Sequence, residues 1–241
     1  MIIVMPEHMT EERKDTIRRL GAELVLCSAE GSFAEAVAIR DDIAQDANCF
    51  NPDQFSNPLN VECHEQTTGQ ELLAQLPHGA QIDAFVAGVG TGGSLMGVGN
   101  AIRKHFPNAM LVAVEPAEAA VMSGGKAANH AIYGIGDGFI PPLVSNGDGG
   151  LHPLIGRVEV VRSEDAIHEA DRLRSDRGLC VGISSGANIL AAKRLRSEGM
   201  SVATLLPDGY WKYRSHGLCE ALDPACAFHD QCPRAVHGTH F

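Results

Sequence analysis

Short apolar runs alternate with amphipathic segments along most of this chain. Runs typical of buried parallel strands fall at residues 2–5, 24–27, 84–87, 110–115, 158–161 and 202–206. Segments compatible with helices follow Thr10 and also occur at residues 32–45, 68–76, 95–105, 164–176 and 187–196. We expect Thr10 to cap the first helix, whose first turn contains Glu11 and Glu12. The alternation predicts an α/β fold with parallel strands and helices on both faces.

Two segments interrupt this alternation. Residues 51–60 are rich in proline and asparagine, which favours a crossing between two domains. Residues 123–156 are rich in glycine and show little periodicity. A loop of that length in a compact domain is usually functional.

The segment I-D-A-F-V-A-G-V-G-T-G-G-S-L-M-G-V-G (residues 82–99) predicts a strand, a glycine turn and a helix. This geometry points successive backbone N–H groups at one anion. Glycines let the backbone approach the anion closely, and hydroxyl groups add further donors. The residues expected to bind a phosphate here are Gly88, Gly90, Thr91, Gly92, Gly93 and Ser94.

The residues around this turn indicate which phosphate-containing ligand it binds. Gly88, Gly90 and Gly93 form a G-x-G-x-x-G pattern, but Glu115 comes too late to be the acidic residue of a dinucleotide site. Ser94 stands where a nucleotide-binding P-loop needs a lysine. The pattern therefore favours a phosphate without a nucleotide partner, as in pyridoxal phosphate, and the alternative is a plain structural turn.

Composition excludes several classes of protein. The formal net charge of -11 over 241 residues argues against nucleic acid or an anionic membrane surface as a partner. No apolar run approaches the ~18 residues of a spanning helix, and residues 1–6 are too short for a signal peptide. The seven cysteines resemble intracellular thiols more than a disulfide framework, so we expect a cytoplasmic protein.

Five segments, in order, resemble the cysteine synthase (O-acetylserine sulfhydrylase) family, within the pyridoxal-phosphate β-family that includes cystathionine β-synthase. They are L-G-A-E-L-V-L (20–26), Q-F-S-N-P-L-N-V-E-C-H-E-Q-T-T-G-Q-E (54–71), G-V-G-T-G-G-S (88–94), Y-G-I-G-D-G-F-I-P (133–141) and G-I-S-S-G-A (182–187). The resemblance covers residues 1 to about 213. It implies a tryptophan-synthase-β-like fold (pyridoxal-phosphate fold type II) with two doubly wound α/β domains, the first truncated. The implied division is residues 1–57 for the small domain remnant, 58–213 for the large domain and 214–241 for a tail.

The resemblance also implies site residues and partners. Ser184 matches a serine that hydrogen-bonds the pyridine nitrogen, Gly134 matches a turn beside the cofactor, and Gln54 matches a glutamine that contacts the substrate carboxylate. The partners implied are pyridoxal 5′-phosphate, an O-acetylserine-like amino acid, sulfide and a second copy of the chain. Tyr133 stands where cysteine synthases commonly have glutamine, and Asp137 also departs from the pattern, which leaves the donor substrate open.

One family feature is missing from this sequence. Family members begin with a Ser-Val-Lys motif, whose lysine forms the Schiff base, and with a Ser-Gly-Asn-Thr-Gly loop that grips the substrate carboxylate. The opening M-I-I-V-M-P resembles a family strand that follows both. The lysines are Lys14, Lys104, Lys126, Lys193 and Lys212, and none has the motif's context. We therefore assign no catalytic residue and expect no turnover from this chain alone.

Near the end of the chain two further interpretations stay open. Asp208 matches a position near the pyridine nitrogen, or it is a residue of a strand-to-helix turn. Cysteines and histidines gather after residue 214, but their spacing matches no known zinc pattern, so we assign no metal site and favour a thiol-bearing tail. The alternative is that these soft ligands together bind Zn²⁺. The residues concerned are Cys219, Cys226, Cys232, His216, His229, His237 and His240.

Two classes of function follow. The first is a β-replacement enzyme of the cysteine synthase or cystathionine β-synthase type, whose lysine segment is supplied from elsewhere or lost by a misplaced start. The second is a catalytically silent relative, either a binding or regulatory module or a decaying fragment. An in-frame lysine segment upstream of Met1 in the coding DNA favours the first class.

Overall fold

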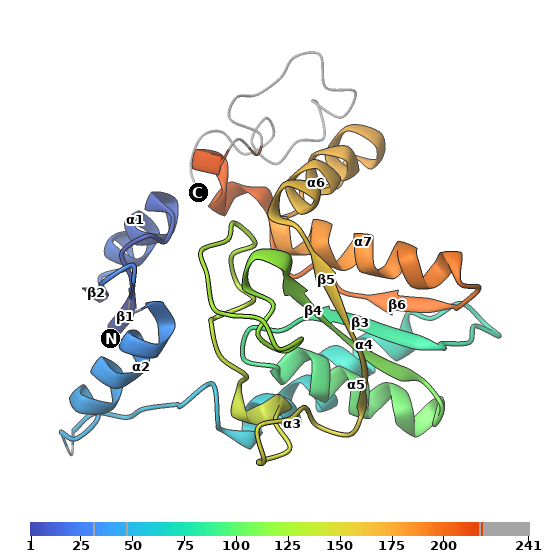
Figure 1. The fold of residues 1–241 in the computed structure, drawn as a ribbon, viewed down its shortest axis with the longest axis horizontal. Coiled ribbons are helices and arrows are strands. Elements are labelled where there is room, and N and C mark those ends of the chain that lie inside the picture. Colours follow the sequence, from blue (N-terminus) through green and yellow to red (C-terminus); the bar gives the residue numbers. More distant parts are fainter. Residues whose placement is uncertain (31, 47, 217, 219–241) are drawn as a thin grey trace.

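Two separate parallel sheets organise this protein in the computed structural model, which describes residues 1–218 except 31, 47 and 217 (Figure 1). The small sheet pairs β1 (Ile2–Pro6) with β2 (Glu23–Cys27). The large sheet has the order β5-β4-β3-β6. Its strands are β3 (Ala84–Gly88), β4 (Met110–Pro116), β5 (Ile155–Val161) and β6 (Val202–Thr204).

Helices cover both faces of the large sheet, as the sequence predicts (Figure 1). On one face lie α3 (Pro58–Gln66), α4 (Thr68–Ala74) and α5 (Gly93–His105). On the other lie α6 (Ser163–Arg177) and α7 (Ile183–Ser197). The small sheet is flanked by α1 (Glu11–Arg19) and α2 (Ser32–Ile43). Short 3-10 helices occupy Ala117–Ala119, Pro142–Val144, Tyr210–Lys212 and Arg214–His216.

Strand β3 lies at the centre of the core and separates two hydrophobic clusters. Ala84 and Val86 pack in the cluster beneath α7, whereas Phe85 and Ala87 pack in the cluster beneath α5. Successive strand side chains point to opposite faces, so a strand covered on both sides must be apolar at every position. The continuous apolar run of β3 is the consequence.

The structure corrects three details of the sequence interpretation. Thr10 occupies the N-cap position of α1, but its side chain makes no capping hydrogen bond and its Oγ1 is buried without a partner. Helix α3 was not predicted, although Asn57 caps it through Leu59 N and Pro58 stands in its first turn. Helix α7 begins at Ile183, four residues earlier than the periodicity indicated.

The small sheet and its two helices form a unit beside the large sheet. No strand pairing joins the two sheets among the described residues. Instead, Ser215 N and Oγ donate hydrogen bonds to the Glu12 carboxylate on α1, at 2.7 and 2.9 Å. This arrangement agrees with a division near residue 57, which stays a prediction.

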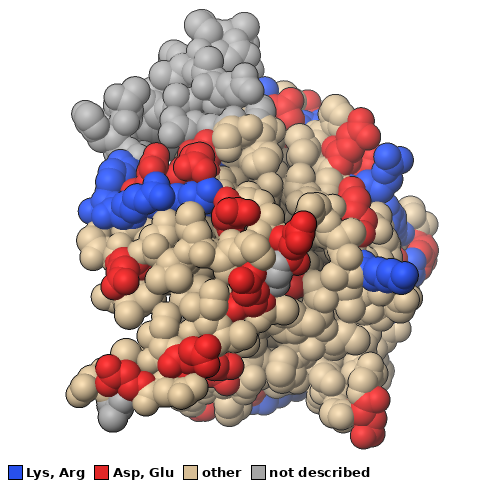
Figure 2. Space-filling model, turned by 60° about the vertical axis from the view of Figure 1, so that its left-hand side comes forward, with Lys and Arg blue, Asp and Glu red and all other residues tan. Residues whose placement is uncertain are grey.

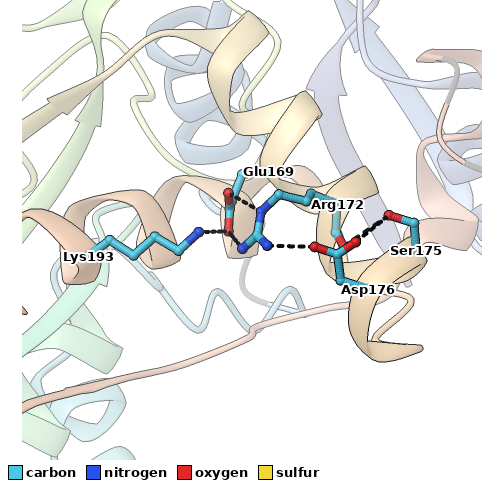
Figure 3. Close-up of polar contacts among 5 residues, drawn as sticks. All are labelled: Glu169, Arg172, Ser175, Asp176 and Lys193. Atoms are coloured by element: carbon cyan, nitrogen blue, oxygen red, sulfur yellow. Dashed lines mark hydrogen bonds and ion pairs between the residues drawn. The ribbon is translucent and has the colours of Figure 1, made fainter.

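A polar network holds α6 against α7 (Figure 3). Glu169 on α6 accepts from Arg172 at 2.8 and 3.0 Å and from Lys193 on α7 at 2.6 Å. Arg172 also pairs with Asp176 at 2.7 Å. Although burial pushes the pKa of Glu169 up, the hydrogen bonds from Arg172 and Lys193 outweigh it and lower the pKa. The carboxylate therefore stays ionised and fixes the orientation of α7.

Charged side chains are scattered over the face turned forward in Figure 2, with uncharged surface between them. Lys and Arg gather at two places on that face, and Asp and Glu are spread more widely.

Within residues 1–218, no helix is long and apolar enough to cross a membrane.

Candidate cofactor site

The carboxyl ends of β3 and β6 and the amino ends of α5 and α7 meet around a cavity of about 650 Å³. Ligands bind at this edge in open parallel sheets, where helix N-termini present unpaired N–H groups. We call it the main cavity. Its polar lining residues are Arg13, His64, Thr68, Thr91, Ser94, Tyr133, Ser184, Asn188, Asp208, Lys212 and Tyr213.

The glycine turn (residues 88–94) forms one end of the main cavity. Gly92 has a φ of +88°, and a Cβ there would lie 2.3 Å from Val144 Cγ1. At Gly90 a Cβ would lie 2.5 Å from the carbonyl oxygen of Gly134. Both positions require glycine. Residues with a side chain rarely adopt the positive φ of Gly92, and at Gly90 a side chain does not fit beside the backbone of Gly134. The turn therefore exposes backbone at the start of α5, which suits a phosphate.

Two hydroxyl groups of this turn are contacted by side chains of helix α3. Asn60 Nδ2 donates to Thr91 Oγ1 at 3.0 Å, and His64 Nε2 lies 3.2 Å from Ser94 Oγ. On its other side, His64 Nδ1 lies 3.0 Å from Thr68 Oγ1 on α4. Burial lowers the pKa of His64, so the imidazole is neutral at pH 7. Both hydroxyl-bearing residues, Thr91 and Ser94, line the cavity.

The amino end of α7 also borders the main cavity. Ser184 is buried in the first turn of this helix and lines the cavity. One turn further along, Asn188 accepts from Gly88 N at 2.8 Å and donates to the carbonyl oxygen of Leu205 at 2.9 Å. Asn188 thereby ties the ends of the strands to α7, which fixes the distance between the glycine turn and Ser184.

Asp208 also lies at this end of the cavity. Its Oδ2 accepts from the Tyr213 hydroxyl at 2.6 Å and pairs with Lys212 Nζ at 3.3 Å, whereas Oδ1 is buried without a hydrogen-bond partner. A Cβ on Gly182 would lie 2.0 Å from that Oδ1, so the carboxylate sits directly beside the start of α7. Burial, together with Asp208, raises the pKa of Tyr213, which stays protonated and donates. Asp208 therefore lines the main cavity, and its position near the pyridine nitrogen stays a prediction.

The loop at residues 133–138 separates the main cavity from a smaller one of about 320 Å³. Tyr133 and Gly134 line both cavities, and the Tyr133 ring stacks on Tyr213 with 6.2 Å between centroids. Asp137 lines the smaller cavity. Burial raises its pKa to about 7, although the positive charge of Arg13 acts to lower it. This loop therefore contains a carboxyl group that titrates near neutral pH.

The structure places most of the predicted site residues together. Gly90, Thr91, Gly92 and Ser94 line the main cavity with Gly134 and Ser184. Gly93 lies behind them, since its Cβ would meet the Asn60 amide, and their roles toward a ligand stay predictions. Gln54 is exposed and is not part of the lining; its carbonyl oxygen accepts from Asn60 Nδ2 at 2.9 Å. Apart from His216, the predicted Cys/His tail lies outside the described residues.

Several lining or supporting residues escaped the sequence analysis, Arg13, Asn60, His64 and Asn188 among them. Arg13 comes from α1 in the small unit, and Asn60, His64 and Asn188 act on residues 30 or more positions away. For Asn60 and His64 a signal was present, because Asn57-Pro58 is a typical start of a helix. Their spacing of four residues then places both on one face of α3.

The pattern that defines the family "Pyridoxal-phosphate dependent enzyme" matches residues 1–208. The chain belongs to this family. The match includes both ends of the main cavity, from the small unit through the glycine turn and Ser184 to Asp208. It shows that the fold is the pyridoxal-phosphate fold type II predicted above.

Relatives within the family are cysteine synthase-like proteins. A cysteine synthase of Staphylococcus aureus is 39% identical over 220 residues, covering 90% of this chain and 69% of the relative. A hydrogen sulfide-producing enzyme of Fusobacterium nucleatum is similar in structure, with a TM-score of 0.81 and 38% identity, covering 95% of this chain and 69% of that one. An O-acetylserine-dependent cystathionine β-synthase of Helicobacter pylori is also similar in structure, with a TM-score of 0.81 and 32% identity. The match covers 90% of this chain and 69% of that chain.

The residues of the main cavity fit the cofactor of the family. A phosphate needs backbone N–H groups and hydroxyl donors with no side chain in the way, and the turn at Gly90 and Gly92 leaves that space. A pyridine nitrogen needs a polar partner at the other end, where Ser184 lies. The cavity of about 650 Å³ falls within the ordinary range for small-molecule sites.

Proposed function

We propose that this chain is the cofactor-holding part of a cysteine synthase-like enzyme. The reaction exchanges the leaving group on the β-carbon of an O-acetylserine-like amino acid for sulfide, which gives cysteine. The observation that supports this most strongly is that the glycine turn and Ser184 line one cavity. The cysteine synthase relatives support the same class of reaction.

In this proposal the two ends of the main cavity have different tasks. Bound pyridoxal phosphate supplies a sink for the electrons released at the substrate α-carbon. The backbone of the glycine turn and the hydroxyls of Thr91 and Ser94 would bind and orient the phosphate. The Ser184 hydroxyl would be the partner of the pyridine nitrogen, and a hydroxyl would not hold that nitrogen protonated as a carboxylate would. Such a neutral partner would suit β-elimination better than transamination.

Asp208 is a weaker candidate than Ser184 for the partner of the pyridine nitrogen. Its charge is balanced by Lys212 at 3.3 Å, and one oxygen is occupied by the Tyr213 hydroxyl. A carboxylate paired in this way is a poor partner for a pyridinium nitrogen, because its negative charge is already compensated. Ser184 therefore remains the neutral partner of the nitrogen.

We infer that none of the lysines forms the covalent link to the cofactor. Lys212 lines the main cavity, but its Nζ pairs with Asp208, whose carboxylate lies beside the start of α7. Lys14 is buried and donates to Glu7 O and Glu11 Oε1, each at 2.6 Å. We infer that the 241-residue chain by itself binds the cofactor without turning over O-acetylserine.

The test is to load the purified chain with pyridoxal phosphate, desalt it and record its visible absorption before and after borohydride. Retained cofactor that borohydride does not fix to a peptide, with no sulfide-dependent cysteine formation, agrees with the proposal. Borohydride labelling of Lys212, abolished by Lys212→Arg and not by Lys14→Arg, contradicts the inference of a missing amine. If the chain retains no cofactor after desalting, the cofactor-holding role is contradicted and a silent relative is favoured.

The donor and the assembly are proposed on the same basis. If the chain acts with a lysine-bearing segment, a panel of amino-acid donors and thiols distinguishes sulfide-using from homocysteine-using chemistry. We also expect a homodimer, which light scattering of the purified chain tests.

A further inference from the structure

We propose that Asn60 and His64 are positioning residues that turn the hydroxyl hydrogens of Thr91 and Ser94 toward the cofactor phosphate. The inference rests on the proposed function, because it concerns how the same site holds its ligand. Asn60 and His64 lie four residues apart on α3, and Thr91 and Ser94 lie three apart in the glycine turn. Residues four apart lie on one face of a helix, and this face of α3 contacts both hydroxyls, at 3.0 Å from Asn60 and 3.2 Å from His64.

At Thr91 the hydrogen-bond roles are fixed by the neighbours. The Asn60 amide donates through Nδ2 to Thr91 Oγ1 and also to the carbonyl oxygen of Gln54, which can only accept. Gly93 N donates to the same Thr91 oxygen at 3.3 Å. A hydroxyl accepts two hydrogen bonds and donates one. With both acceptor positions occupied, the Thr91 hydroxyl keeps its hydrogen for a group in the main cavity.

At Ser94 the outcome depends on the tautomer of His64. If Nε2 bears the hydrogen, His64 donates to Ser94 Oγ and accepts from Thr68 at Nδ1, and the Ser94 hydrogen is free for the phosphate. In the other tautomer Ser94 donates to His64 and has no hydrogen left for a ligand. A bound phosphate therefore selects the first arrangement, because only that arrangement adds a charge-assisted hydrogen bond.

Protonation of His64 strengthens the binding of the phosphate. A protonated imidazole donates through both nitrogens, so the Ser94 hydrogen stays available and a positive charge lies one hydroxyl away from the phosphate. Burial is the cause of the lowered pKa of His64, and no neighbouring charge contributes to it. Glu65, the neighbour of His64, pairs with Lys104 at 2.5 Å on the outside of the α3–α5 contact. The other charged groups on the packed helices or across the main cavity are Glu62, Glu71, Arg103, His105, Arg13, Asp208 and Lys212.

Quenching of Trp211, the single tryptophan, by added pyridoxal 5′-phosphate gives the Kd of the full chain. Asn60→Leu is expected to raise this Kd several-fold, because the Thr91 hydroxyl is no longer oriented and its charge-assisted hydrogen bond to the phosphate is weakened. Asn108→Leu, at an exposed turn position, is the matched control and is expected to leave the Kd unchanged. In a Thr91→Val background Asn60→Leu should have little further effect, because the hydroxyl that it orients is gone.

The role of His64 is tested by measuring the Kd at different pH values. His64→Gln keeps a donor for Ser94 but cannot take a proton, so its Kd should match that of the unmodified chain near pH 8. The ratio of its Kd to that of the unmodified chain should rise only at pH values below the ordinary histidine range, because burial lowers the pKa of His64 and delays its protonation. The ratio cancels the ionisation of the phosphate itself, which is common to both proteins.

The outcomes separate the two proposals. If the unmodified chain does not bind pyridoxal phosphate, the proposed function fails and this inference with it. If the chain binds but Asn60→Leu behaves as Asn108→Leu, or loses as much affinity with Thr91→Val as without it, only the inference is overturned. A Kd ratio for His64→Gln that is constant with pH overturns the His64 part alone.

Discussion

Gly88 and Asn188, 100 residues apart in sequence, are joined by a hydrogen bond of 2.8 Å from the backbone N–H of Gly88 to the side-chain oxygen of Asn188. The same amide donates to Leu205 O at 2.9 Å. One fully buried side chain thus connects the ends of two strands to the helix that bears Ser184. The geometry between the two ends of the main cavity depends on this residue.

Replacing Asn188 with leucine should therefore destabilise the fold by about 2–4 kcal/mol, because a buried N–H and a buried carbonyl lose their partner. Urea unfolding measures the loss, and Asn108→Leu at an exposed position provides the control. An unchanged unfolding midpoint for Asn188→Leu would show that water or a rearranged backbone satisfies both groups.

Gly92→Ala tests the close approach in the glycine turn. Gly92 and Gly147 have nearly the same positive φ, +88° and +86°, but only at Gly92 would a Cβ meet a neighbour, Val144. Gly147→Ala should cost about 1 kcal/mol from backbone strain alone. Gly92→Ala should cost clearly more and should also reduce binding of pyridoxal phosphate, measured by retained absorption after desalting. Equal effects of the two substitutions would count against a tight turn.

Ser184→Ala tests the pyridine end of the main cavity. The variant should lower affinity for pyridoxal phosphate several-fold, because a hydrogen bond to the ring nitrogen is lost. Ser185→Ala is the matched control: its Oγ is buried without a partner, so its removal should leave affinity unchanged and stability unchanged or slightly higher. A larger loss of affinity for Ser185→Ala than for Ser184→Ala would reassign the nitrogen partner.

Asp137→Asn tests the carboxyl group of the 133–138 loop. Burial raises the pKa of Asp137 to about 7, above its value of ~3.9 in an unfolded chain. A raised pKa means that the folded state loses stability as the pH rises from about 4 to about 7, where the group ionises. Asp137→Asn should therefore stabilise the protein by about 1–3 kcal/mol at pH 8 and have little effect at pH 4.

Urea unfolding across this pH range provides the measurement for Asp137→Asn. Asp148→Asn, at an exposed loop position, should show no such pH dependence. A stability difference for Asp137→Asn that is the same at pH 4 and pH 8 would show that the carboxyl does not titrate in this range.

Glu169→Gln tests the network between α6 and α7 (Figure 3). Removing the charge leaves Arg172 and Lys193 without their shared buried partner, and about 1–3 kcal/mol should be lost at pH 7. Because the folded pKa of Glu169 is depressed, the contribution is present above its unfolded value and disappears as the pH falls through the folded pKa. Glu164→Gln, at an exposed position on the same helix, is the control. An equal loss at pH 3 and pH 7 would mean that packing, not charge, is responsible.

Much of the large sheet could be predicted because its signals are local. The continuous apolar run of β3 follows from burial on two faces, and the glycine turn is encoded within seven residues. The start of α7 was placed too late, since G-I-S-S-G-A has no helical periodicity of its own and becomes helical by packing on the sheet.

The sequence by itself determined the alternation of strands and helices, the glycine turn with Thr91 and Ser94, and the family. These features depend on residues close in the chain, whose periodicity and turn chemistry do not need a partner. Only the tertiary structure decided that Asn60 and His64 stand behind those hydroxyls, that Arg13 reaches the main cavity and that Gln54 lies outside it. These relationships join residues brought together by packing of α1, α3 and α5, and no local pattern specifies such contacts.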